Sequence, residues 1–199
     1  MAQYFIVSFV FIGGKIVKKW VSISEDYLKA LRKVEPRIPF SDYGDDRFKP
    51  FFSPLFEIGD LSYVTQVSSV KERHRKMHNQ KDFKKVYDSH GQLISVINLN
   101  YMFPVPTVIL KEVKYKDIDR YRIFKNDDER SAHIHLLKIE MLAINSMNLT
   151  YHAKYIYNLK YQKPLDTISM RCFDFKKLEI IAINYLSRIQ NESKEYIAV

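Results

Sequence analysis

Lysines and hydroxyl groups are the side chains of this sequence whose spacing could support chemistry. Lys49 stands just before one β-rich run, Ser68 and Ser69 close the next, and Lys71 follows two residues later. Lysine has a reference pKa of about 10.4 and stays charged near neutral pH, so Lys49 and Lys71 can act as electrostatic clamps or proton donors. The serines can bind phosphate oxygens through their hydroxyls and the amides of the turn.

Cleavage of RNA without a metal ion needs only groups of these kinds. The RNA supplies its own 2′-hydroxyl as nucleophile, and the protein must align it, stabilise the phosphorane and protonate the leaving 5′-oxygen. On composition alone, a solvated Ser-Ser turn beside a basic loop explains the pattern more often than a catalytic site does. The residue types therefore leave both interpretations open.

The most basic segment of the chain follows the two serines. The chain as a whole has 32 Lys and Arg against 23 Asp and Glu and a sequence pI of about 9.4. This balance favours a polyanionic partner, either nucleic acid or an acidic membrane surface. With Arg47 from the preceding loop, the predicted RNA-binding side chains are Arg73, His74, Arg75, Lys76, Lys81, Lys84 and Lys85. Tyr43 and Tyr63 lie beside basic residues and could stack on single-stranded bases.

The usual catalytic signatures are missing. Gly13–Lys15 lacks the glycine spacing of a phosphate-binding loop. In the predicted helix, His133 and His135 point to different faces, and His74 with His78 lacks the carboxylate of a metalloprotease motif. We therefore expect no metal ion and no cofactor.

The cysteine content and the N-terminal segment indicate a cytoplasmic protein. Cys172 is the single cysteine, which excludes an internal disulfide framework. The apolar run Tyr4–Ile12 is too short to span a bilayer as a helix, and its lysines follow the run, whereas those of a signal peptide precede it. We interpret this segment as an edge strand or as an extension upstream of the natural start.

The hydrophobic pattern predicts strands followed by helices. Ser22 and Glu25 have the spacing of a capping box, and a short helix should follow them up to Pro36. Gly59-Asp60 separates two β-rich runs as in a hairpin, and further strands are expected over 91–106 and 107–115. The second half has helical periodicity from Asp127, with helices over 133–147, 149–161 and 173–189.

The expected architecture is α+β, with a twisted antiparallel sheet or partial barrel followed by a helical C-terminal half. Nothing in the composition marks a flexible linker or a repeat. We expect one domain over 1–199, in which residues 1–19 form an N-terminal extension and residues 20–199 the functional domain. Residues 1–17 are predicted to be dispensable.

Four ordered segments resemble the ToxN/AbiQ family of type III toxin–antitoxin endoribonucleases. SISEDYLKALRKVEPRIP resembles the family's opening helix, RFKPFFSPLFEI its strand entry and YVTQVSSVK its strand end. LISVINLNYMFPVP is similar to the family signature L-I-N-L-x-[FY]-M-[IF]-P-V, the most specific of the four. Gln66 and Val70 depart from the pattern, because prolines are common at those positions, and Ser68 stands where threonine is frequent.

The resemblance implies a site and a partner. It places the active-site tyrosine on Tyr27, the lysine on Lys49, the hydroxyl pair on Ser68 and Ser69, and a second lysine on Lys71. Tyr43 is the approximate counterpart of a further family tyrosine in the loop before the lysine.

The resemblance also implies a Kid/MazF-like sheet and metal-free cleavage that leaves a 2′,3′-cyclic phosphate and a 5′-hydroxyl. The implied partner is a pseudoknotted RNA antitoxin, cut from a repeated transcript and bound in an RNA-bridged assembly, in a system of phage abortive infection. We expect the groove between Lys49, Ser69 and the segment 73–85 to hold this RNA, with an affinity that salt weakens steeply.

Two other functions remain open. The basic loop could belong to a non-catalytic regulator that binds RNA or DNA, with the serines merely shaping a turn. The chain could also be a type II toxin neutralised by an acidic protein. A directly repeated DNA element upstream of the gene would argue against that second alternative.

Overall fold

A computed structural model describes residues 11–12, 15–41, 44 and 47–195, and the side chains of 17–192 within these ranges. Most of the expected strand at Tyr4–Ile12 lies outside the described residues, as does Tyr43. A two-stranded hairpin of β1 (Phe11–Ile12) and β2 (Lys15–Ile16) precedes the main sheet. None of the helices in these ranges has the length and apolarity needed to cross a bilayer.

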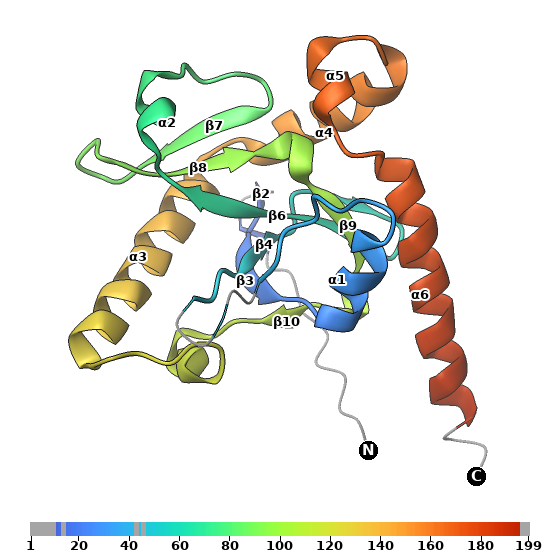
Figure 1. Cartoon of the computed structure of the whole chain (residues 1–199), viewed down its shortest axis with the longest axis horizontal. Helices are drawn as coiled ribbons and strands as arrows, with labels where there is room; N and C mark the ends of the chain where they lie inside the picture. The colour runs from blue at the N-terminus through green and yellow to red at the C-terminus, as the bar shows by residue number, and fades with distance from the viewer. Residues whose placement is uncertain (1–10, 13–14, 42–43, 45–46, 196–199) are drawn as a thin grey trace.

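The centre of the molecule is an open antiparallel sheet of eight strands (Figure 1). Its main path runs β10-β3-β4-β6-β8-β7, and β5 and β9 also pair with β6, so β6 is the central strand. The strands are β3 (Lys19–Ser22), β4 (Phe51–Ser53), β5 (Glu57–Ile58), β6 (Leu61–Ser69), β7 (Phe83–Tyr87), β8 (Leu93–Asn98), β9 (Phe103–Pro106) and β10 (Lys111–Glu112).

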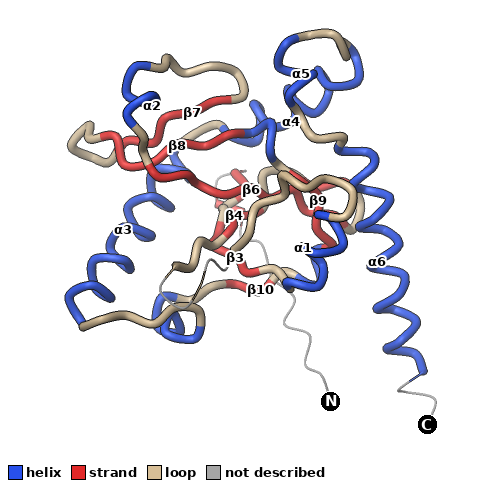
Figure 2. The backbone as a smooth tube through the Cα atoms, in the orientation of Figure 1, coloured by secondary structure: helices blue, strands red, loops and turns tan. Residues whose placement is uncertain are grey.

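Helices flank the sheet on two sides, as Figure 2 shows. The helix α1 and the long α6 lie beside β9, whereas α3 climbs towards β7 and β8 at the other end of the sheet. The helices are α1 (Glu25–Arg32), α2 (Glu72–Lys76), α3 (Asp127–Ser146), α4 (Leu149–Gln162), α5 (Thr167–Arg171) and α6 (Phe175–Glu195). The predicted α+β class with a helical second half is confirmed.

The apolar core joins the sheet to these helices. Phe51, Phe52 and Phe103 are fully buried, and the rings of Phe51 and Phe103 meet edge to face. The Trp20 indole donates a hydrogen bond to the Leu137 carbonyl over 2.9 Å, which fixes β3 to α3. Buried aromatic rings contribute most to such a core because each removes a large apolar surface from water.

Local signals locate some elements and misplace others. The hairpin at Gly59 is confirmed: its φ of +55° suits glycine, and β5 pairs with β6 across it. The capping box is wrong, since Ser22 belongs to β3 and the Glu25 carboxylate pairs with Arg32 instead. The strand expected over 107–115 is also largely wrong, because a 3-10 turn over 107–109 leaves only β10.

Candidate active site

Ser68 and Ser69 are the last two residues of the strand β6. Ser68 pairs with Val96 and Ser69 with Ser95 of β8. Successive residues of a strand point to opposite faces and paired residues share a face, so Ser69 and Ser95 lie on one face and Ser68 on the other. Ser69 is exposed and Ser68 is half-buried. The two serine hydroxyls therefore lie on opposite faces of the sheet.

Lys49 is fixed to this strand by its backbone. Its N–H donates to the Ser41 carbonyl over 2.8 Å, and its own carbonyl accepts a hydrogen bond of 2.8 Å from the Gln66 side chain. The same Gln66 amide donates to the Phe40 carbonyl over 2.7 Å. The loop that carries Lys49 is thus tied to β6 two residues before Ser68. The departure from the family proline at Gln66 supplies this anchor, which the sequence did not reveal.

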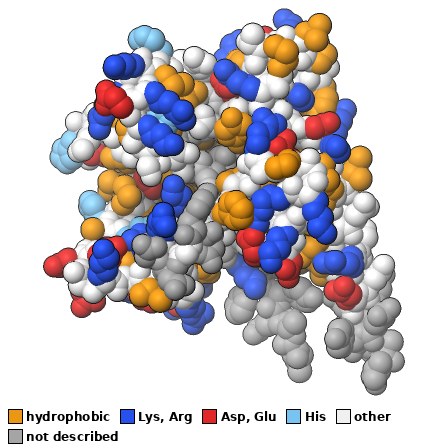
Figure 3. Space-filling view, viewed as in Figure 1, with side chains coloured by type: hydrophobic (Ala, Val, Ile, Leu, Met, Phe, Trp, Pro, Cys, Tyr) orange, Lys and Arg blue, Asp and Glu red, His pale blue; other side chains and the backbone are white. Residues whose placement is uncertain are grey.

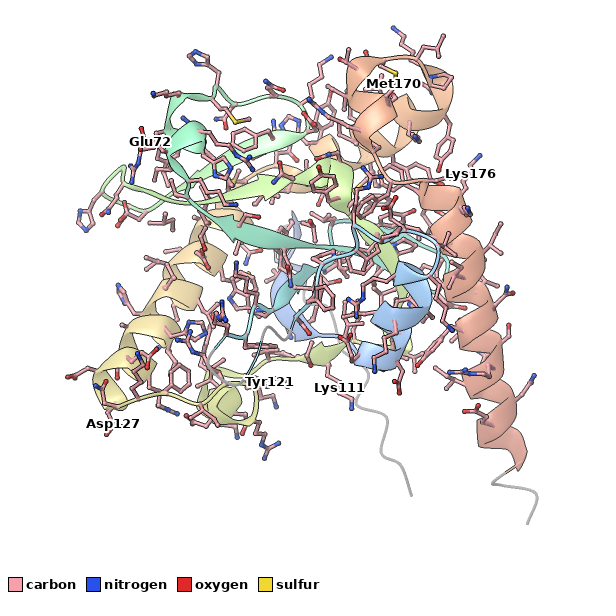
Figure 4. The ribbon with its side chains drawn as sticks, viewed as in Figure 1. Glu72, Lys111, Tyr121, Asp127, Met170 and Lys176 are labelled. Carbon is pink, nitrogen blue, oxygen red and sulfur yellow. The ribbon has the colours of Figure 1, made fainter. Side chains whose placement is uncertain are left out.

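An aromatic stack holds the other side of the same loop. Phe48 is buried, and its ring stacks on Tyr121, labelled in Figure 4, with 4.7 Å between the ring centroids. The exposed side chains of Arg47 and Lys49 flank this buried ring. The loop is therefore anchored at Phe48 while its two cations reach the surface.

The turn after β6 is built around His74. This imidazole is 4% exposed, and its Nδ1 accepts a hydrogen bond of 3.1 Å from the Lys71 N–H. Burial and then the charges of Arg73 and Lys71 lower the pKa of His74, with a smaller opposing contribution from the Ser69 backbone. The prediction that His74 binds RNA is wrong, because its ring is enclosed and braces the turn between Ser69 and Lys71.

Lys71 and the Lys and Arg side chains of α2 are exposed, and Figure 3 shows Lys and Arg side chains gathered over this region. Other lysines of the segment bind within the protein. The Lys85 ammonium donates to the Arg75 carbonyl over 2.9 Å, and that of Lys81 to the Tyr155 hydroxyl over 2.6 Å. Lys84 is half-buried, which lowers its pKa. The exposed basic cluster is Lys71, Arg73, Arg75 and Lys76.

Two tyrosines predicted for the site belong to the core. Tyr27 is fully buried and donates a hydrogen bond of 2.7 Å to the Pro104 carbonyl, and burial raises the pKa of its hydroxyl. Tyr63 is also fully buried and donates to the Glu179 carboxylate over 2.7 Å. Stacking of Tyr63 on RNA bases is therefore wrong, and the structure does not bring Tyr27 to the serines.

A hollow opens on the Ser68 face of the sheet. Its volume is about 80 Å³, and it is lined by Arg37, Pro39, Thr65, Gln66, Ser68, Asn98 and Tyr101. Arg37 forms a bidentate ion pair with Glu35, and its guanidinium lies 5.9 Å from the centre of the exposed Tyr101 ring. The hollow thus presents a cation, an aromatic ring and hydroxyl groups side by side. Among all the described side chains, no three His, Cys, Asp or Glu residues lie close enough together to hold a metal ion.

The sequence of this chain matches a known protein family and a curated relative. The family described as toxin ToxN of type III toxin–antitoxin systems matches residues 19–182. Endoribonuclease ToxN of Bacillus thuringiensis subsp. kurstaki is 24% identical in an alignment 189 residues long that covers 89% of each chain.

Solved structures share the fold. A type III toxin–antitoxin system in which an RNA pseudoknot selectively inhibits the toxin matches with a TM-score of 0.67 and 23% identity, over 84% of this chain and 97% of that one. AbiQ, a lactococcal anti-phage endoribonuclease, matches with a TM-score of 0.69 and 14% identity, over 86% and 99%. A bacterial antiviral system regulated by a processed non-coding RNA matches with a TM-score of 0.65 and 18% identity, over 81% and 94%.

Since the family match covers most of the sequence, from β3 to the middle of α6, the chain belongs to the ToxN family of type III toxin–antitoxin systems.

Proposed function

We propose that this chain is an endoribonuclease toxin that cleaves RNA without a metal ion. The 2′-hydroxyl of the RNA attacks the adjacent phosphate, and the products carry a 2′,3′-cyclic phosphate and a 5′-hydroxyl. The Lys49 ammonium stabilises the charge of the phosphorane, the Ser69 hydroxyl orients a phosphate oxygen, and Lys71 holds the neighbouring phosphate. The chain would act in the cytoplasm, where its RNA substrates are found.

The observation that carries the proposal is the double anchoring of Lys49 beside the end of β6. Its N–H and carbonyl are both bound, through Ser41 and Gln66, while its side chain is exposed near the two serines. A rigid backbone under an exposed cation is what electrostatic stabilisation of a transition state requires, because the charge need not reorganise during the reaction. The exposed basic cluster beside it supplies contacts for the phosphates that flank the cut.

We also propose an RNA antitoxin as the partner that restrains the enzyme. Among the relatives of similar fold, one toxin is inhibited by an RNA pseudoknot and one antiviral system is regulated by a processed non-coding RNA. In this chain the repeated pseudoknot would bind the exposed basic cluster, be cut from its transcript at the same site, and bridge protomers into a closed assembly. Release of the RNA antitoxin would free the toxin, and the phage infection would then be aborted.

The test is cleavage of RNA by the purified protein in EDTA, followed by analysis of the RNA ends. We expect cutting without added ions, cyclic phosphate and 5′-hydroxyl ends, and loss of cutting in Lys49→Ala and in Ser69→Ala. Lys111→Ala, an exposed lysine on the edge strand β10, is the matched control and should cut normally.

Three outcomes would contradict the proposal. Binding of RNA without cutting under any condition would favour the non-catalytic regulator, and cutting only with a divalent ion would overturn the mechanism. Undiminished cutting by both variants would show that the site lies elsewhere.

A further inference from the structure

A buried carboxyl group, that of Glu140, lies on the face of the sheet that carries Ser69 and Ser95. Glu140 belongs to the C-terminal half of α3, which packs towards β7 and β8 in Figure 1. The residue is only 4% exposed, and among the described residues it makes no ion pair and no hydrogen bond of ordinary length. A buried carboxylate without a close partner is unfavourable, so its presence in the core requires an explanation.

Two groups of the candidate active site act on this carboxyl. The Ser95 hydroxyl, which faces Ser69 across the β6–β8 pair, makes a loose contact with Glu140 and no ordinary hydrogen bond to the rest of the described chain. The second group is the Lys49 ammonium, whose charge reaches Glu140. Burial raises the pKa of Glu140 to about 7, while Ser95 and Lys49 oppose the rise. Glu140 therefore changes its charge near neutral pH.

The other charged groups around this end of α3 act on one another. Lys84 of β7 interacts with Asp82. Burial, and then the charge of Lys84, lower the pKa of His152 on α4. At the opposite, N-terminal end of α3, Arg122 from the preceding loop and Glu129 act on His133. The buried Lys18 lies close to Thr150 of α4, with 3.5 Å from its ammonium to the hydroxyl. Lys49 is thus the charged side chain, within the described part of the chain, that acts on Glu140.

We propose that Glu140 is a positioning residue of the RNA-cleaving site, in which its ionised carboxylate holds the Lys49 ammonium towards the Ser69 edge and orients the Ser95 hydroxyl that faces Ser69. The proposal rests on the proposed function. Glu140 is too deeply buried to touch RNA, so it acts through Lys49 and Ser95. Protonation of the carboxyl removes the attraction to Lys49, and cleavage then slows.

The test compares single-turnover cleavage by the full chain and by Glu140→Gln from pH 5.5 to pH 8.5. Glutamine keeps the size of the side chain but cannot ionise. We expect the wild type to cut about tenfold faster than the variant at the alkaline end, an effect typical of a positioned charge. At the acid end the two should be similar, because wild-type Glu140 is then protonated and neutral as well.

The shape of this ratio separates positioning from a merely structural role. A structural defect would lower the rate by the same factor at every pH. The matched control is Glu179→Gln, which removes a carboxylate bound to Tyr63 and Tyr157 away from the serines and should give a ratio independent of pH. A ratio for Glu140→Gln that does not change with pH would overturn the inference while the wild type still cuts RNA. An inert wild type would instead overturn the proposed function.

A second variant keeps the inference testable if Glu140→Gln does not fold. Ser95→Ala removes the hydroxyl that lowers the pKa of Glu140. The acid limb of cleavage should therefore move to higher pH in this variant. An unchanged limb would contradict the role of Glu140.

Discussion

The side-chain amide of Gln66 donates hydrogen bonds to the carbonyls of both Phe40 and Lys49, at 2.7 and 2.8 Å, and so joins the lysine loop to the central strand. A single side chain thereby sets the distance between the cation and the serines that follow it on β6. The sequence alone shows only that Gln66 departs from the proline that is common at this position in the family. The structure shows how the position is used instead.

Gln66→Ala should lower both stability and cleavage. The variant leaves two carbonyl acceptors without their donor, which costs about 1–2 kcal/mol of the free energy of unfolding. Cleavage should fall about tenfold because Lys49 is no longer held in place, while RNA affinity changes little. Denaturant unfolding and single-turnover cleavage measure the two effects. Gln92→Ala, at an exposed glutamine in the β7–β8 turn, serves as control. A variant with full cleavage would show that the anchor does not serve the site.

Ser68→Ala and Ser69→Ala should have different kinetic effects. Ser69 shares a face with Ser95 and lies exposed at the strand end, whereas Ser68 lines the hollow with Arg37 and Tyr101. We expect Ser69→Ala to lower kcat about a hundredfold, as the loss of a transition-state contact does. Ser68→Ala should mainly raise KM, by about tenfold, because a hydroxyl lining a binding surface contributes to ground-state affinity. Equal kcat losses would indicate that both hydroxyls act on one phosphate.

Much of the fold could be predicted because its signals are local. The period of apolar residues located α4 and α6, and Asn126 caps α3, accepting a hydrogen bond of 2.9 Å from the Glu129 N–H, one residue before the predicted start at Asp127. The 3-10 turns over 107–109 and 115–120 could not be predicted, since packing rather than propensity chooses them. The loop that carries Lys49 is held at the carbonyls of Phe40 and Lys49 by Gln66, which lies far along the chain.

The candidate site was predictable in residue type but not in exposure. The sequence identifies tyrosines and histidines near basic residues, yet it does not say which of them the tertiary structure encloses, as it does Tyr27, Tyr63 and His74. Glu140 does have a local signal in the sequence. It lies three residues after Leu137 and four before Ile144, both buried, and therefore on the apolar stripe of α3. A carboxylate on such a stripe indicates a special environment.

The exposed basic cluster should account for the salt dependence of RNA binding. Replacing Arg75 or Lys76 by alanine should weaken the affinity for RNA regardless of sequence and reduce the slope of log K against log salt by about one per lost phosphate contact. Lys176→Ala is the control, because this exposed lysine lies at the start of α6, 4.5 Å from the centre of the Tyr161 ring (Figure 4). Titrations at several salt concentrations measure the slopes. A smaller slope in the control alone would place the RNA on the α6 side.

Glu140 should also make the folded protein less stable as the pH rises. Its pKa is about 7 in the folded state, against an ordinary value of 4.5, so the folded state binds more protons than the unfolded state between these two pH values. The contribution of Glu140 to the free energy of unfolding is therefore greatest below about pH 4.5. About 3 kcal/mol of this free energy is lost as the pH rises to 7. Glu140→Gln removes the effect, so its stability relative to the wild type should increase from pH 5 to pH 8.

Unfolding in denaturant at fixed pH values measures this difference, with Glu179→Gln as the reference. A stability difference between wild type and Glu140→Gln that stays constant with pH would show that Glu140 does not titrate near neutrality. The sign of the effect also bears on function. The pH range in which the ionised carboxylate destabilises the fold is the range in which it should assist cleavage, and a group retained only for stability would not show this opposition.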